Sequence, residues 1–185
     1  MLSDMEYLEI LDEKGDKTGG SKSFNEVHEQ GFIHRTVHVW ILNSKKELLI
    51  QKRAKNKRAH PGCWDISAAG HISAGQTSLE AAQREVMEEL GIEISESKFK
   101  FLFTVESRSI LNNGTYINNE FQDVYIIPID LDIITMKLEK DGEVEQVKFI
   151  DVEEFKKWII GEREPMVPHK EEYTKLLEHI EKNYL

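Results

Sequence analysis

The chain has 185 residues, of which 39% are hydrophobic and 31% are charged. This length and this balance favour one compact globular domain and exclude a chain that is disordered throughout. The formal net charge is -10, so the phosphates of a nucleic acid would be repelled, and we expect no nucleic acid partner.

The cellular location is predicted from cysteine usage and from the amino terminus. The single cysteine, Cys63, cannot form an intramolecular disulfide, and we expect it to pack in the core. The first residues lack the basic and apolar regions of a signal peptide. No apolar run approaches the roughly 18 residues that cross a bilayer, so no membrane partner is expected. These features predict a cytoplasmic protein.

The first strands follow a polar N-terminal extension at 1–30. Within it, the apolar stretch 7–11 and the turn after it predict one short strand. Apolar and β-branched residues at 36–42 and 48–50, with a polar turn between them, predict a hairpin. The core begins at this hairpin, and the main domain is expected to span 31–165.

A basic loop and a helix come next. The irregular stretch 52–58 leads into the turn residues 61–64. A helix is predicted from Thr77 to Gly91, because Thr77 and Glu80 have the spacing of a capping box and Gly91 suits the C-cap. Its apolar residues recur on one face, so that face should pack on the core.

The second half of the chain predicts more strands and two helices. Strands are expected at 99–105, 124–129 and 147–150, and a helix at 153–160. Apolar residues at helical spacing predict a closing amphipathic helix at 166–185 that packs on the domain. Strands that alternate with a few helices predict an α/β sandwich, in which helices cover a mixed β-sheet.

Three carboxylates lie close together on the predicted helix. Glu85, Glu88 and Glu89 are three and four residues apart, so at about 100° per residue they share one flank. Oxygen ligands in this number suit Mg²⁺ or Mn²⁺. Taken alone, however, a glutamate-rich helix face is more often solvated surface.

The sequence around the helix favours the metal site. Gly70-His71-Ile72-Ser73-Ala74-Gly75-Gln76 is followed, seven residues later, by Arg84-Glu85-Val86-Met87-Glu88-Glu89-Leu90-Gly91-Ile92. This pattern resembles the 23-residue box of the Nudix (MutT-like) hydrolase family, which implies a Nudix-type α/β/α sandwich. The match covers eight positions: Gly70, Arg84, Glu85, Val86, Glu88, Glu89, Gly91 and Ile92.

One position departs from the box. The family has a glutamate where this chain has Gln76, and the resemblance implies that this residue supports the loop by pairing with Arg84. Gln76 can still accept a hydrogen bond from Arg84, although without charge assistance. Structural roles are therefore expected for Gly70, Gln76, Arg84 and Gly91.

The resemblance also implies roles in catalysis. Glu85, Glu88 and Glu89 would hold a divalent metal against a diphosphate, and a carboxylate would activate the attacking water. The family often places its base or a further ligand outside the box. The candidates here are Glu120, Glu143 and Glu145, and the last two are more readily explained as solvated surface.

A narrower resemblance covers most of the chain. The order of Phe32-Ile33-His34-Arg35, the basic loop, Gly70-His71 and Asn119-Glu120 is similar to that of isopentenyl-diphosphate isomerase, itself a Nudix-fold enzyme. It implies a second metal site of His34, His71 and Glu120, for which His28 is a less secure further ligand. It also implies that Lys52, Arg53 and Lys57 bind the diphosphate, although each of these histidines and cations could instead be an ordinary polar or solvated residue.

The isomerase chemistry itself is not expected. It needs a cysteine immediately before the Gly-His pair, and this chain has Ala69 there. A metal-dependent Nudix hydrolase of a small organic diphosphate is therefore the first interpretation, with an isomerase or a non-catalytic diphosphate-binding module as alternatives. Nucleotides, nucleotide sugars and isoprenoid or thiamine-like diphosphates all stay open as substrates, and so does a homodimer.

Overall fold

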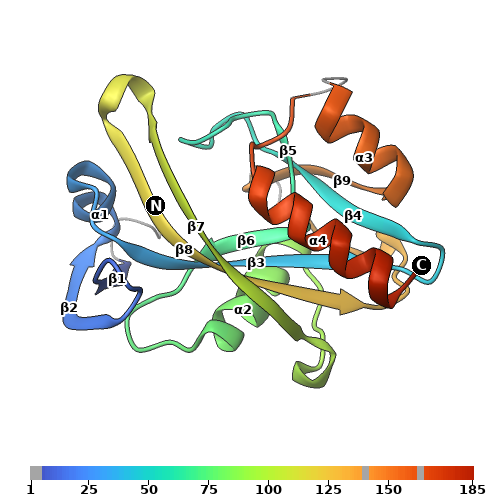
Figure 1. The fold of residues 1–185 in the computed structure, drawn as a ribbon, viewed down its shortest axis with the longest axis horizontal. Coiled ribbons are helices and arrows are strands. Elements are labelled where there is room, and N and C mark those ends of the chain that lie inside the picture. The colour runs from blue at the N-terminus through green and yellow to red at the C-terminus, as the bar shows by residue number, and fades with distance from the viewer. Residues whose placement is uncertain (1–5, 139–141, 162–164) are drawn as a thin grey trace.

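The computed structural model describes residues 6–138, 142–161 and 165–185. Within these residues a two-stranded sheet precedes a seven-stranded mixed sheet (Figure 1). The small sheet consists of β1 (Tyr7–Leu11) and β2 (Lys17–Ser23). The strands of the large sheet are β3 (His34–Leu42), β4 (Glu47–Arg53), β5 (Trp64–Asp65), β6 (Ala68–His71), β7 (Lys100–Leu111), β8 (Tyr116–Pro128) and β9 (Val144–Asp151).

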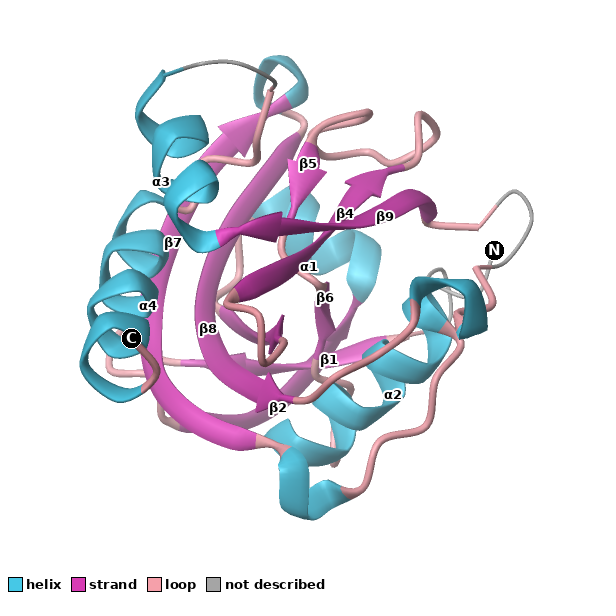
Figure 2. Cartoon of the chain, turned by 90° about the vertical axis from the view of Figure 1, so that its right-hand side faces the viewer, coloured by secondary structure: helices cyan, strands magenta, loops and turns pink. Residues whose placement is uncertain are grey.

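Four α-helices accompany the sheets in the described parts of the chain. They are α1 (Phe24–Gln30), α2 (Ser78–Leu90), α3 (Val152–Gly161) and α4 (Lys170–Asn183). The large sheet lies between α2 on one side and α3 and α4 on the other (Figure 2). The predicted α/β sandwich with a mixed sheet is therefore confirmed. None of the described helices is long and apolar enough to cross a membrane.

The centre of the sheet is β3, because it pairs with three other strands. It is antiparallel to β4 and β6 and parallel to β8. Its side chains alternate between the faces of the sheet, as strand geometry requires. Val37, Val39 and Ile41 pack in the apolar cluster on the α2 side, whereas Trp40 and Leu42 pack in the cluster that includes α3 and α4.

The predicted hairpins form, and two strands are longer than predicted. The β3–β4 hairpin pairs Ile41 with Leu49, in agreement with the prediction. Strands β7 and β8 were expected to stop at 105 and to begin at 124, but they continue as a paired ribbon to Leu111 and Tyr116. The added residues include polar side chains that gave no alternating apolar signal, and pairing between the two strands holds them extended.

Two further predictions concern Cys63 and the N-terminal extension. Cys63 is only half-buried, because it lies in the loop just before β5 and not in the core. The N-terminal strand β1 forms as predicted. Its first residue contacts the loop between β6 and α2, since the Ala74 N–H donates to the Tyr7 carbonyl at 2.7 Å. Residues 1–5 of the predicted extension lie outside the described residues.

Candidate active site

The helix that carries the box carboxylates is fixed at both ends by its own sequence. Thr77 and Glu80 form the predicted capping box, in which each side chain accepts from the other residue's backbone N–H. Gly91 ends the helix in the left-handed region, with φ 65°. A Cβ on Gly91 would also lie 2.4 Å from the Lys137 carbonyl oxygen, so glycine is required there for both reasons.

The three box carboxylates do not share one exposed flank, which corrects the expectation from their spacing. Glu85 and Glu89 are buried, at 6% and 5% exposure, whereas the Glu88 side chain is 58% exposed. Glu88 and Glu89 differ by about 100° around the helix, one on each side of Glu85. Packing of α2 against β6 therefore covers Glu85 and Glu89 and leaves Glu88 outside.

Strand β6 approaches the two buried carboxylates with its backbone. A Cβ on Gly70 would lie 2.0 Å from the Glu85 carboxyl group, so only glycine fits at this position. The Ala69 N–H donates to Glu89 Oε2 at 2.9 Å, and the Gln51 side chain donates to the same oxygen at 2.8 Å. Gln51 was not predicted from the sequence, because only the pairing of β4 across the sheet brings it here.

The buried pair is electrostatically strained without a cation. Burial, and then the charge of Glu89, raise the pKa of Glu85 above its ordinary value. Burial also raises the pKa of Glu89, although Lys57 opposes the shift. Ionised carboxylates in such a place need a compensating positive charge, and a divalent cation supplies it. The donor chemistry thus fits the predicted metal.

Arg84 supports the site, but not through Gln76. It pairs with Glu85 at 2.7 Å and with Glu88 at 2.9 Å, and it donates to the His71 carbonyl at 2.7 Å. The Gln76 side chain instead accepts from the Ser73 N–H at 3.3 Å. No hydrogen bond joins Gln76 to Arg84 within the described residues, because the guanidinium already has carboxylate partners on its own helix.

A second cluster combines four side chains from four elements. His28 comes from α1, His34 from β3, His71 from β6 and Glu120 from β8, and one donor atom of each lies within 4.8 Å of the others. The parallel pairing of β3 with β8 puts His34 directly beside Glu120. The structure thus brings together the three positions implied by resemblance and also His28.

Hydrogen bonds to backbone carbonyl groups orient two rings of this cluster, and Nε2 of His28 lies 3.3 Å from Nε2 of His71. Nδ1 of His28 bonds the Phe24 carbonyl at 2.8 Å, and Nδ1 of His34 bonds the Phe32 carbonyl at 3.0 Å. Each ring therefore turns Nε2 toward the cluster, and Nε2 of His34 is buried without a partner. A buried orphan atom requires an explanation, and a bound cation is one.

The charge state of the cluster is that of a metal ligand set. Burial lowers the pKa of His28 to about 4 and lowers that of His71 well below its ordinary value, so both rings are neutral near pH 7. Burial opposes ionisation of Glu120, but the neighbouring imidazoles outweigh it and lower the pKa of Glu120, with Nε2 of His34 lying 3.6 Å from a Glu120 carboxylate oxygen. Neutral imidazoles beside an ionised carboxylate suit a divalent ion.

The three cations predicted to bind the diphosphate all face carboxylates. Arg53 pairs with the buried Asp65 at 2.9 Å. Lys57 pairs with Glu143, and Lys52 lies 3.9 Å from Glu145. The Arg53 guanidinium is therefore part of the fold, whereas Lys52 and Lys57 have exposed, easily exchanged partners. Glu143 is also close enough to raise the pKa of Glu85 and Glu89.

A buried polar network on the α4 side was not predicted at all. Glu172 accepts from Nδ1 of His38 at 2.6 Å and from the indole N–H of Trp40 at 2.7 Å. Glu172 falls within the closing helix predicted at 166–185, and its sequence pattern gives no sign of a partner on β3. Since more than 130 residues separate the partners, no local pattern in the sequence could have paired them.

Comparison with known proteins shows what this chain is similar to. Residues 32–177 match the NUDIX domain. The chain is 43% identical over 182 residues to Nudix hydrolase 3 of Arabidopsis thaliana, which covers 95% of this chain but only 23% of that protein. It is 35% identical over 122 residues to an isopentenyl-diphosphate Delta-isomerase of Serratia proteamaculans, covering 66% of each.

A solved structure agrees on the fold. The crystal structure of a Deinococcus radiodurans protein aligns with a TM-score of 0.68 and covers 97% of this chain and 100% of that one. The two sequences are 21% identical, so this likeness concerns the fold alone.

Proposed function

The chain belongs to the Nudix family, and on that basis we propose that it is a Mg²⁺- or Mn²⁺-dependent hydrolase that cleaves the diphosphate linkage of a nucleoside or other small organic diphosphate. The observation that carries the proposal is the buried pair Glu85 and Glu89 beside β6, where a strand backbone closes on two carboxylates. A merely solvated glutamate face would not be buried in this way.

Each group has a task in the proposed reaction. Glu85, Glu88 and Glu89 would hold the metal, which when bound neutralises charge on the diphosphate. His34, His71 and Glu120, with His28, would hold a second divalent ion. Arg84 orients Glu85, and Gly70 lets the strand reach it.

The candidates for the base differ in their surroundings. Glu143 is exposed and pairs with Lys57, and its charge adds to the burial that raises the pKa of Glu85 and Glu89, so we propose Glu143 as the base. Glu120 is buried and accepts from Gln122 at 2.8 Å, which suits a fixed ligand better than a base. Glu145 lies 3.9 Å from Lys52, and within the described residues no hydrogen bond or salt bridge joins it to Glu85 or Glu89.

A panel of diphosphates tests the proposal. Purified protein is incubated with nucleoside diphosphates, nucleotide sugars and isoprenoid diphosphates, with Mg²⁺ or with EDTA, and phosphate or nucleotide release is measured. We expect hydrolysis of at least one compound with Mg²⁺ and none with EDTA. Release that continues unchanged in EDTA, or binding of diphosphates without release, would contradict a metal-dependent hydrolase.

We predict that the protein does not interconvert isopentenyl and dimethylallyl diphosphates. Allylic proton transfer needs an acid and a base on opposite faces of the substrate, and the methyl group of Ala69 can be neither. Incubation with labelled isopentenyl diphosphate and Mg²⁺, followed by acid treatment, measures the acid-labile product. If that product formed, His38 would be the first suspect, because it lies directly across from Ala69 in the β3–β6 ladder.

Several sequence-based expectations stay predictions. They are the cytoplasmic location, the lack of a nucleic acid partner, the homodimer, and the division into an extension at 1–30, a domain at 31–165 and a helix at 166–185.

A further inference from the structure

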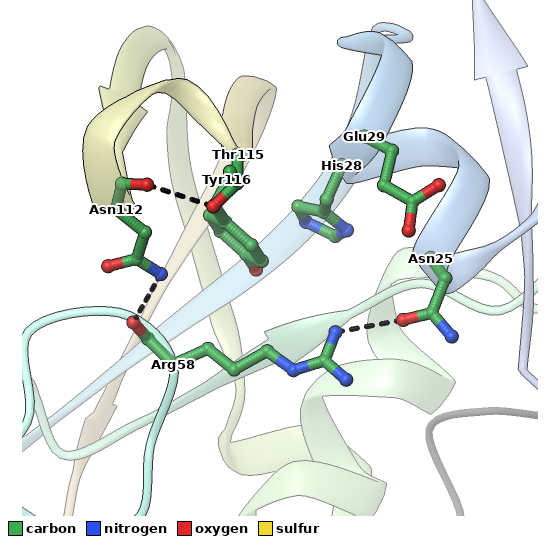
Figure 3. Close-up of a pocket in the computed structure, with 7 residues that line it drawn as sticks. All are labelled: Asn25, His28, Glu29, Arg58, Asn112, Thr115 and Tyr116. Carbon is green, nitrogen blue, oxygen red and sulfur yellow. Dashed lines mark hydrogen bonds between the residues drawn. The ribbon is translucent and has the colours of Figure 1, made fainter.

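A pocket opens beside the histidine cluster, between three segments that are distant in the sequence. Its volume is about 360 Å³ (Figure 3). Helix α1 contributes one wall, Arg58 of the basic loop the second, and the tip of the β7–β8 ribbon the third. The lining residues are Asn25, His28, Glu29, Arg58, Asn112, Thr115 and Tyr116.

The pocket adjoins the proposed active site through His28, which belongs to both. Tyr116 stacks on the His28 ring, with centroids 4.4 Å apart. A substrate whose phosphates reach the histidine cluster can therefore extend its organic group into this pocket. The α1 wall precedes residue 32, where the match to the NUDIX domain begins, so this wall is an addition to the shared domain.

The walls of the pocket carry hydrogen-bonding groups of opposite kinds. Arg58 offers only donors, and within the described residues its side chain donates one hydrogen bond, to the neutral Asn25 at 2.8 Å. It differs in this from Arg53 and Lys57, which face carboxylates. Glu29, on α1, offers only acceptors. Among the described residues no salt bridge involves Arg58 or Glu29, so both charges are available to a ligand.

A hydrogen bond joins the loop that contains Arg58 to the ribbon wall of the pocket. The Asn112 side chain donates to the Arg58 carbonyl at 3.0 Å, and the Arg58 guanidinium lies 5.9 Å from the centre of the Phe24 ring. Asn112 lies at the tip of the β7–β8 ribbon, where its backbone has a left-handed φ of 52°. The guanidinium is thus held at the pocket and is not a freely moving surface charge.

We propose that this pocket is a specificity subsite that selects diphosphates whose organic group carries hydroxyls, with Arg58 and Glu29 as the selecting residues. A sugar or ribose hydroxyl can donate to Glu29, and a second hydroxyl oxygen can accept from Arg58. A hydrocarbon group would remove water from both charges and pair with neither. The inference rests on the proposed hydrolysis, and it adds the substrate class.

The test compares three diphosphates that share the reacting group. They are UDP-glucose, ADP and isopentenyl diphosphate, each assayed with Mg²⁺ for kcat/KM. ADP offers only ribose hydroxyls, whereas UDP-glucose offers those of a ribose and of a hexose. For the unmodified protein we expect kcat/KM to be at least roughly tenfold higher for a hydroxylated compound than for isopentenyl diphosphate.

Two variants connect that preference to the pocket. Glu29→Gln and Arg58→Gln should each lower kcat/KM for the hydroxylated compound, mainly through KM, and should change the value for isopentenyl diphosphate little. Matched controls are Glu178→Gln, on the exposed surface of α4, and Arg108→Gln, whose partner is Glu13. Both controls should retain the preference.

Failure of the subsite proposal and failure of the proposed hydrolysis would give different results. Metal-dependent cleavage of isopentenyl diphosphate as efficient as that of the hydroxylated compounds would overturn the subsite and leave the hydrolase standing. Equal losses for all three substrates in the two variants would also overturn it. An absence of metal-dependent cleavage of all three would overturn both the proposed function and the subsite.

Discussion

Replacing Glu89 by glutamine is expected to lower kcat by at least roughly a hundredfold. Glutamine keeps the size of the side chain and an oxygen that can accept from Ala69 and Gln51, so the fold should persist. The negative charge that would bind the metal is lost. Steady-state hydrolysis of a substrate found in the diphosphate panel measures the effect, and circular dichroism checks the fold.

The same substitution should make the metal-free protein more stable at high pH. The pKa values of Glu85 and Glu89 are raised in the folded state, so the folded state holds more protons than the unfolded chain above the ordinary glutamate pKa. Their contribution to stability is complete below that pKa and is lost as pH rises through the raised values. In EDTA, the unmodified protein should therefore lose Tm between pH 5 and 8, and Glu89→Gln should lose less.

Glu88 provides the comparison for both measurements. Glu88→Gln should also lower turnover, since it removes a proposed ligand. Its side chain is exposed, so this substitution should change the pH dependence of Tm less than Glu89→Gln does. Near-native hydrolysis by both variants would mean that the box carboxylates have been assigned wrongly. A Tm that is independent of pH in EDTA would contradict the raised pKa values of Glu85 and Glu89.

Replacing Glu172 by alanine is expected to cost about 3–5 kcal/mol of stability. The substitution leaves two buried donors without an acceptor, Nδ1 of His38 and the Trp40 indole N–H. Burial alone would lower the pKa of His38, but the charge of Glu172 outweighs it and raises that pKa, so the substitution also removes the carboxylate that favours the protonated ring. Tm should fall by roughly 6–20 °C.

Urea unfolding and thermal scans measure this loss. Glu171→Ala is the matched control. Glu171 is the exposed neighbour of Glu172 on α4, and within the described residues its salt bridge is to Lys175, at 2.7 Å. That pair should contribute less than about 1 kcal/mol. Glu172→Gln should lie between the two, since one amide oxygen can still accept from one of the donors. Equal effects of Glu171→Ala and Glu172→Ala would show that the buried network does not hold α4.

Features that depend on neighbouring residues could be predicted from the sequence. The ends of α2 follow from Thr77, Glu80 and Gly91, because capping uses side chains within one turn. The β3–β4 hairpin follows from two β-branched runs and the turn between them. The proposal that the box binds a metal rests on a pattern of 23 residues, which is local as well.

Features that depend on packing could not be predicted in the same way. The periodicity of α2 puts Glu85 and Glu89 near one another, but only the approach of β6 decides that they are buried and that Glu88 is not. The partner of Arg84 was expected to be Gln76, because the choice between competing acceptors depends on coordinates. Gln51 reaches Glu89 only through strand pairing.

The second candidate site, the histidine cluster, could be predicted only in part. His34, His71 and Glu120 were grouped by resemblance, and the spacing of His28 gave little support to its inclusion. In the structure, α1 turns His28 toward the other three. The pocket beside it was not foreseen, since its walls meet only in three dimensions. Arg58 was therefore not distinguished from the other cations of its loop.

The hydrogen bond from Trp40 to Glu172 also has a consequence during synthesis. Glu172 leaves the ribosome 132 residues after Trp40, a delay of roughly 7–26 s at typical translation rates. Throughout this interval, the face of β3 that carries His38 and Trp40 lacks the helix that covers it. The nascent chain therefore presents an open apolar surface for seconds, and closure of α4 completes folding only after the whole sheet has been translated.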